Sequence, residues 1–277
     1  MDIPKCRICG KEYILNPFAL DKLPPGALDK LPPGFASHIK YIPACECFEK
    51  FKDKELEEAE RKRQAECIRN KVKKYRDISI IDSKFLMSTF KNADRSTEVM
   101  KLAEKFSEKF LAKGTTNVGI FLHGKVGTGK TFAAACIANE LMDHNKTVLV
   151  MNLGLYLNKL KREWAEAEND VLNYVKTCDL LIIDDLGVEN ITDWVQDKVF
   201  ALIDTRYRSG KPLILTTNLE LDNSSLSENE IKNKLSIESR FNPRISNRIA
   251  EMCYSFSVEG KNYRQYGAKE KMKELLK

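Results

Sequence analysis

One ten-residue stretch of the chain contains residue types suited to holding the phosphate groups of a nucleotide. In HGKVGTGKTF, residues 123–132, a glycine is followed, after four residues, by Gly-Lys-Thr. Glycines let the backbone turn tightly and point N–H groups at phosphate oxygens. Lys130 supplies a compact positive charge for the β- and γ-phosphates, and the Thr131 hydroxyl can hold Mg²⁺. The spacing predicts a site for ATP and Mg²⁺ made by Gly124, Lys125, Val126, Gly127, Thr128, Gly129, Lys130, Thr131 and Phe132.

The segments on either side of this stretch fit such a site. VGIFLHG, before it, has the pattern of a buried strand, and TFAAACIANELMDHN, after it, has the pattern of a helix. The start of that helix would direct its partial positive charge at the phosphates. A loop that matches the pattern by chance is the less favoured interpretation, because both flanking elements are in place.

Four further strand-like segments follow, separated by helical patterns: TVLVMN, DLLIIDD, PLILTTN and YSFSV. Strands that alternate with helices indicate an α/β fold with a doubly wound, mainly parallel sheet of five strands. Ligands of such sheets bind at the carboxyl ends of the strands. Polar residues at those ends are therefore the next candidates.

Two of these segments end in residues that suit nucleotide hydrolysis. In LLIIDDLG, Asp184 can hold Mg²⁺ and Asp185 can orient or deprotonate the attacking water. Because an Asp reaches less far than a Glu, we expect slow or regulated hydrolysis. In LILTTNLE, the amide of Asn218, which follows Thr217, can hydrogen-bond the γ-phosphate or the water. The alternatives are an acidic turn and an ordinary turn asparagine.

Two arginines follow in the segment ESRFNPRISNRIAEMC. Arg244 and Arg248 are four residues apart, so they share one face of the predicted helix. Such a pair can complete the ATP site of a neighbouring copy by stabilising phosphoryl charge. A surface pair or a DNA-facing pair is the alternative. As the catalytic residue, Arg248 is favoured only slightly over Arg244.

The composition restricts the class of protein. The chain has 277 residues, of which 43% are hydrophobic, and a formal net charge of +6, compatible with nucleic acid but no proof of it. No apolar run approaches the roughly 20 residues of a membrane span. The start MDIPKCRICG lacks the apolar stretch of a secretory signal. We expect a cytoplasmic protein with no membrane contact, whose eight cysteines are free thiols or metal ligands.

Four of the cysteines form two close pairs near the N-terminus. The pairs are Cys6 with Cys9 and Cys45 with Cys47, and Gly10 follows the first pair as in a knuckle turn. Four thiolates arranged in this way suit tetrahedral zinc. The alternative is two unrelated pairs of reduced cysteines, because the second pair is tight and the intervening segment is long.

We therefore divide the chain into a cysteine-rich module at 1–50, a charged helical linker at 51–77 and an ATPase core at 78–277. The linker carries a basic second half that either contacts phosphate backbones or is simply solvated. Between the cysteine pairs, residues 19–34 repeat ALDKLPPG twice, which we interpret as a tolerated duplication in a surface loop.

These motifs, in this order, resemble the AAA+ ATPases. The resemblance is closest to the bacterial DnaC/DnaI-type replicative helicase loaders, whose near relatives are the IstB-type transposition ATPases. It covers about residues 78–277 and depends on LHGKVGTGKT, LLIIDDLG, LILTTNL, RISNRIAEMC and VEGKNYRQY. The cysteine cluster is weakly similar to the zinc-bearing region of some DnaI-like loaders.

The resemblance implies an ATPase that loads a DnaB-type hexameric replicative helicase onto single-stranded DNA, with ATP hydrolysis as the switch. It also implies a homo-oligomer in the ATP-bound state, with ATP between neighbouring copies, and an N-terminal region that docks on the helicase. By position, the DNA-facing surface would include Tyr156, Lys159, Lys161 and Arg162. The same segment fits equally well an ordinary amphipathic helix with its leucines inward: Leu153, Leu157 and Leu160.

Most AAA+ ATPases carry a helical lid after the fifth strand, whereas only residues 259–277 follow Val258 here. We expect no full C-terminal lid, and Arg264 in NYRQY is the candidate for the role of a lid arginine at the nucleotide. The main alternative function is an IstB-like transposition helper ATPase, although the cysteine-bearing N-terminus favours a loader. A metabolic kinase would need an Arg-rich lid, and a processive motor would need a second helicase domain. The sequence favours neither of these two classes.

Overall fold

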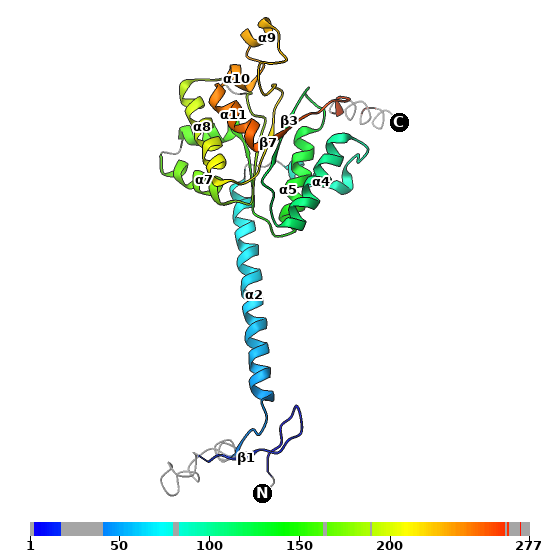
Figure 1. The fold of residues 1–277 in the computed structure, drawn as a ribbon, viewed down its shortest axis with the longest axis vertical. Coiled ribbons are helices and arrows are strands. Elements are labelled where there is room, and N and C mark those ends of the chain that lie inside the picture. The colour runs from blue at the N-terminus through cyan, green and yellow to red at the C-terminus, as the bar shows by residue number, and fades with distance from the viewer. Residues whose placement is uncertain are drawn as a thin grey trace. The chain divides into compact units, whose positions relative to one another are not determined.

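In the computed structural model the chain is described over residues 3–17, 41–79, 83–162, 165–188 and 190–263, together with 265 and 272. The repeat at 19–34 and Arg264 lie outside these residues. The chain divides into two compact units, Met1–Cys67 and Ile68–Lys277. Each unit is described by itself below (Figure 1).

The first unit holds a small two-stranded sheet and most of a long helix. Strands β1 (Ile14–Leu15) and β2 (Tyr41–Ile42) pair in antiparallel fashion. Helix α2 (Cys47–Ile78) has 32 residues, and most of its described side chains are exposed, as the charged sequence predicts. The boundary between the two units falls inside α2, so the last turns of this helix belong to the second unit.

The second unit is built on a five-stranded sheet whose strands all pair in parallel in the order β4-β5-β6-β3-β7. The strands are β3 (Gly119–His123), β4 (Val148–Asn152), β5 (Leu180–Asp184), β6 (Leu213–Thr216) and β7 (Cys253–Ser257). All five predicted strands are confirmed. The order of the strands along the chain differs from their order in the sheet, so the sheet is doubly wound. As a result, β3 lies beside β6 and the carboxyl ends of these two strands are adjacent.

Helices cover both faces of this sheet, as Figure 1 shows for α7, α8 and α11 on one side and α4 and α5 on the other. The helices are α3 (Ser83–Met87), η2 (Phe90–Asn92), α4 (Glu98–Lys113), α5 (Lys130–Asp143), α6 (Leu153–Arg162), α7 (Ala165–Thr177), α8 (Asp193–Ser209), α9 (Glu228–Lys232), α10 (Ile237–Arg240) and α11 (Pro243–Met252). Alternate strand residues point into two hydrophobic clusters, so both faces of the sheet are buried. In the described part of the chain, no helix has the length and apolar character needed to cross a membrane.

A fully buried arginine ties several of these elements together. Arg206 on α8 is 0% exposed, and its guanidinium donates to the carbonyls of Val175, Cys178, Asp179 and Pro212 over 2.7–3.0 Å. Burial lowers the pKa of Arg206, but the surrounding carbonyls accept its hydrogen bonds. The residue therefore joins the end of α7 to the starts of β5 and β6.

Replacing Arg206 by methionine is expected to lower the free energy of unfolding by at least about 3 kcal/mol, because several buried carbonyls lose their donors at once. Arg208→Met is the matched control, since this exposed side chain only pairs with Asp204 on the same helix and should change stability by about 0.5 kcal/mol or less. Urea unfolding followed by tryptophan fluorescence measures both variants. Equal losses for the two would contradict the structural role of Arg206.

Candidate nucleotide site and cysteine cluster

The glycine-rich loop lies between β3 and α5, where the parallel sheet predicts a ligand site. Gly124, Gly127 and Gly129 all have positive φ angles, of 128°, 84° and 100°. Residues with side chains rarely adopt such angles, so the loop requires glycine at these positions. Gly129 is also the N-cap of α5, and having no side chain it cannot itself cap the first backbone N–H groups of the helix, which are the groups that bind anions at helix starts.

Lys130 is held at the centre of this loop. Its side chain is buried at 6% exposure, and its ammonium donates to the carbonyls of Gly124 and Lys125, both at 2.7 Å. It also donates to the amide oxygen of Asn218 at 3.0 Å. These three acceptors are neutral oxygens, and a phosphate group brought to the loop supplies anionic ones. The structure thus joins the predicted lysine directly to the predicted asparagine.

The two aspartates are organised by a buried threonine on the neighbouring strand. The Thr216 hydroxyl donates to Asp184 Oδ1 at 2.5 Å and accepts from the backbone N–H of Asp185 at 3.0 Å. Asp185 has a φ of 56°, in the left-handed region that short polar side chains tolerate best. This backbone conformation gives a physical reason for Asp rather than the longer Glu at this position.

One cavity of about 730 Å³ brings most of the predicted site residues together. Its wall includes Val126, Gly127, Thr128, Gly129, Lys130, Thr131, Phe132, Asp184, Asp185 and Asn218. Gly124 and Lys125 are not part of this wall but hold the lysine through their carbonyls. The remaining lining adds an apolar region that includes Phe85, Val99 and Met100. One part of the cavity holds a lysine and carboxylates, which suit a triphosphate and a hard divalent cation. The other part holds apolar side chains, which suit an aromatic base.

The two predicted arginines do not line this cavity. Arg244 is exposed on α11. Arg248, on the same helix, is held within the chain: its guanidinium pairs with Asp204 at 2.9 Å and lies 4.7 Å from the centroid of the Phe200 ring. An arginine that acts on nucleotide from this helix would therefore serve another copy of the chain, and Arg244 is the more accessible of the two.

Several residues that build the cavity were not among the predicted ones. Asn139, in the middle of α5, is 5% exposed and donates from its amide to the carbonyls of Phe85 and Ser88 at 2.9 and 2.8 Å. It thereby fixes the segment that supplies the apolar wall. An asparagine directly after the apolar run FAAACIA was a visible signal. Asp94 and Tyr263 line the cavity; Tyr263 directly precedes the predicted Arg264, whereas nothing in the local sequence of Asp94 indicates a site.

The four N-terminal cysteines come together as predicted. The sulfur atoms of Cys6, Cys9, Cys45 and Cys47 all lie within 4.8 Å of one another. Gly10, at a φ of 74°, closes the first turn by donating its N–H to the carbonyl of Cys6 at 2.9 Å. The number of sulfur ligands and their proximity fit a structural zinc site.

The thiol pKa values in this cluster also suit a cation. Backbone N–H groups of Cys9 and Ile8 lower the pKa of Cys6 to about 6, so this sulfur is ready to act as a thiolate. Conversely, the neighbouring sulfurs of Cys9 and Cys45 raise the pKa of Cys47 to about 12. Four thiolates cannot easily form side by side unless a cation lies among them.

Of the two interpretations left open for the segment around Tyr156, the burial of this residue supports the ordinary amphipathic helix rather than a DNA-facing ring. Tyr156 is 2% exposed, and the same face of α6 buries Leu153 and Leu157. The helix thus follows the amphipathic alternative, because the hydrophobic cluster below it takes the aromatic ring as well as the leucines. Lys159 and Lys161 remain exposed on α6, whereas the side chain of Arg162 lies outside what the structure describes.

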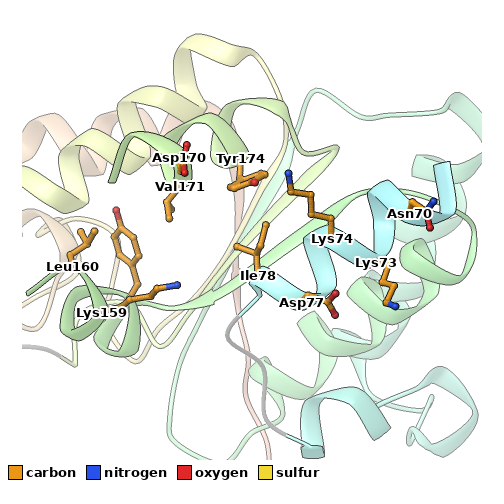
Figure 2. A pocket seen from close by; sticks show the side chains of 11 residues that line it. Asn70, Lys73, Lys74, Asp77, Ile78, Lys159, Leu160, Asp170, Val171 and Tyr174 are labelled. Atoms are coloured by element: carbon orange, nitrogen blue, oxygen red, sulfur yellow. The ribbon is translucent and has the colours of Figure 1, made fainter. Parts of the chain in front are cut away.

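A second cavity, of about 610 Å³, lies where the last turns of α2 meet α6 and α7 (Figure 2). Its lining includes three lysines, Lys73, Lys74 and Lys159, and two aspartates, Asp77 and Asp170. The ring of Tyr174 makes two contacts here. Lys74 Nζ lies 5.3 Å from its centroid, and the Tyr75 ring packs edge-on against it with the two centroids 5.4 Å apart. Tyr75 also hydrogen-bonds Thr177 at 2.7 Å, so this wall holds the end of α2 in place.

The strand order and the site define the protein as an AAA+ P-loop protein. A family model described as "IstB-like ATP binding protein" matches residues 43–271, and the chain belongs to this family. A crystal structure of DnaI, 25% identical, covers 67% of this chain and 95% of that one with a TM-score of 0.52.

Two curated relatives have a named role. The replicative helicase loader DnaI of Bacillus subtilis (strain 168) is 29% identical over 154 residues, which are 53% of this chain and 47% of that protein. The replicative helicase loader DnaC of Escherichia coli (strain K12) is 28% identical over 138 residues, 48% of this chain and 56% of that protein. The chain thus spans about half the length of the curated relatives it matches.

Proposed function

We propose that this protein is an ATP-dependent factor that binds a DnaB-type hexameric replicative helicase and loads it onto single-stranded DNA. The observation that carries the proposal is the meeting of Lys130, Asp184 and Asn218 in one cavity of a chain that is similar to helicase loaders. The AAA+ core would act as a nucleotide-controlled switch, slow in hydrolysis because Asp185 reaches less far than Glu.

The predicted polar residues of the cavity each have a proposed task. Lys130 and the backbone N–H groups of the loop hold the phosphates. Thr131 and Asp184 hold Mg²⁺, which neutralises phosphate charge when bound. Asp185 and Asn218 orient the attacking water, and Asn218 is already placed against the lysine ammonium at 3.0 Å. Arg264 remains a candidate for phosphate contact outside the described residues.

Assembly is the second part of the proposal. Arg244 and Arg248 lie outside the cavity of their own chain, which supports a role at the ATP site of an adjacent copy in a homo-oligomer. The exposed Lys159 and Lys161 on α6 are candidates for contacts with the phosphates of single-stranded DNA.

The N-terminal module is the proposed docking part for the helicase, and zinc its proposed structural metal. Purified protein is expected to contain about one zinc per chain, and Cys9→Ser should lose most of it together with the fold of the module, because three thiolates hold zinc far more weakly than four. Metal analysis and limited proteolysis measure the two effects. Cys67→Ser is the control, as this exposed cysteine on α2 lies outside the cluster. If the purified wild-type protein contained no zinc and its N-terminal module still resisted proteolysis, a structural metal in this module would be excluded.

A transposition helper ATPase is the alternative function, because the matching family model carries the IstB-like description. Recruitment of the partner distinguishes the two. Tagged full-length protein is incubated with the host's replicative helicase, or with a transposase from the same host, in the presence of ATP and single-stranded DNA. We expect stable capture of the helicase, docking retained in Lys130→Ala, and loading onto DNA lost in that variant. Capture of the transposase but not of the helicase would decide for the alternative.

A further inference from the structure

The segment after β7 runs along the glycine-rich loop. The backbone N–H of Val258 donates to the carbonyl of His123 at 2.7 Å, just before the loop. At the other end of the segment, the N–H of Tyr263 donates to the carbonyl of Gly127 at 2.9 Å. The segment is therefore bonded to the last residue of β3 through Val258 and to the loop itself through Tyr263.

Two glycines of the loop allow this close approach. A Cβ atom placed on Gly124 would lie 2.6 Å from the Val258 carbonyl oxygen, and one on Gly127 would lie 2.2 Å from Oδ1 of Asn262. Both distances are shorter than atoms tolerate. The segment is thus packed directly on the backbone of the loop, and its position depends on the position of the loop.

The side chain of Tyr263 enters the wall of the nucleotide cavity from this segment. Its hydroxyl donates to Asp94 Oδ2 at 3.5 Å, and Asp94 lines the same cavity from the turn before α4. Hydrogen bonds from Ser96 are the main cause that lowers the pKa of Asp94, and the nearby Lys261 adds to the effect, so this group is a carboxylate at neutral pH. Tyr263 therefore links the segment after β7 to the turn before α4.

The charges around the cavity decide which half of a nucleotide belongs beside Tyr263. Beside Tyr263 the Asp94 carboxylate is balanced by Lys261, whose Nζ lies 5.1 Å from the Tyr263 ring centroid. Lys130 and the loop N–H groups, by contrast, concentrate the positive charge that attracts phosphate. The neutral half, the base with its ribose, then faces the wall made by Tyr263 and apolar side chains such as Phe85 and Met100. An aromatic ring favours contact with a base or a sugar face.

We propose that Tyr263 is a nucleoside-binding residue of this cavity, held in place by its backbone bond to Gly127 and its hydroxyl bond to Asp94. The proposal rests on the proposed function only in requiring that the cavity bind ATP. Neither the P-loop pattern nor the acidic motif identifies this residue, because the ring comes from the far end of the chain.

Calorimetric titration of the full-length protein with two probes tests the proposal: ADP, which carries a nucleoside, and inorganic tripolyphosphate, which does not. Tyr263→Ala is expected to weaken ADP binding by about tenfold or more and to change tripolyphosphate binding by about twofold or less. Tyr263→Phe, which keeps the ring, should bind ADP within about threefold of the wild type. Tyr254→Ala, on the exposed side of β7, is the control and should leave both affinities unchanged.

Three results would overturn the proposal. Unchanged ADP affinity in Tyr263→Ala would exclude a contact with the nucleoside. An equal loss for ADP and tripolyphosphate would show that the residue only supports the loop. A loss in Tyr263→Phe as large as in Tyr263→Ala would assign the effect to the Asp94 bond rather than to the ring. A wild-type protein that binds neither probe would refute the ATP site itself.

Discussion

Lys130→Ala is expected to lower ATP turnover by at least about a hundredfold and to weaken ATP binding by about tenfold or more. The reason is that the lysine supplies the buried ammonium of the phosphate loop, held by Asn218 and two loop carbonyls, and alanine removes this charge. Phosphate release measured at saturating ATP, together with calorimetric titration, separates the loss in turnover from the loss in binding.

The matched control for this variant is Lys146→Ala. Lys146 follows α5 at its opposite end and bonds the carbonyl of Gly114 at 3.0 Å on the exposed surface. Removing it deletes one lysine near the same helix without touching the cavity, so turnover should stay within about twofold of the wild type. Should Lys130→Ala and Lys146→Ala hydrolyse ATP at the same rate, the cavity would not be the site of hydrolysis.

Removal of both arginines on α11 is expected to leave ATP binding intact but to lower turnover by about a hundredfold or more, because in the proposed assembly a guanidinium from the adjacent copy would stabilise phosphoryl charge. Mixing two inactive variants and measuring ATP turnover tests more directly whether the arginines act across an interface. Chains with Arg244→Ala and Arg248→Ala, mixed with Lys130→Ala chains, should recover part of the activity. In a mixed oligomer some sites combine an intact loop from one chain with intact arginines from the other.

The single variants distinguish the two arginines. Arg248→Ala also removes the ion pair with Asp204 and the packing on Phe200, so it should lower thermal stability as well as turnover. Arg244 is exposed, and its alanine variant should affect turnover alone. If mixed samples show no more activity than the sum of the separate variants, the arginines do not act across an interface.

The sheet could be predicted because each of its strands has a local signature. LLII, for example, is a continuous apolar run followed by two aspartates, and the structure forms β5 over this run and the first aspartate. Burial of both sheet faces makes such runs uniformly apolar, so they stand out from the helical periodicity around them. The phosphate loop was equally visible, since glycine spacing and the Lys-Thr pair are contiguous in sequence.

Contacts between distant segments could not be predicted in this way. Asn139 bonds a carbonyl 54 residues away, and Arg206 bonds carbonyls up to 31 residues away. Neither residue has a pattern that names its partner. Tyr156 shows the opposite problem, because one helical periodicity fits both a buried ring and a DNA-facing ring until the hydrophobic cluster below α6 is known.

Helicase loading on a closed DNA circle tests the central proposal most directly. The substrate is circular single-stranded DNA that carries one annealed labelled strand and is covered with single-stranded DNA-binding protein. A closed helicase ring cannot thread onto this circle. Unwinding by the host's replicative helicase is measured with the wild-type protein and with Lys130→Ala, the variant in which this chain is expected not to hydrolyse ATP. The account predicts strong stimulation by the wild type and a loss of it in the variant. Unwinding that is the same with and without this protein would contradict it.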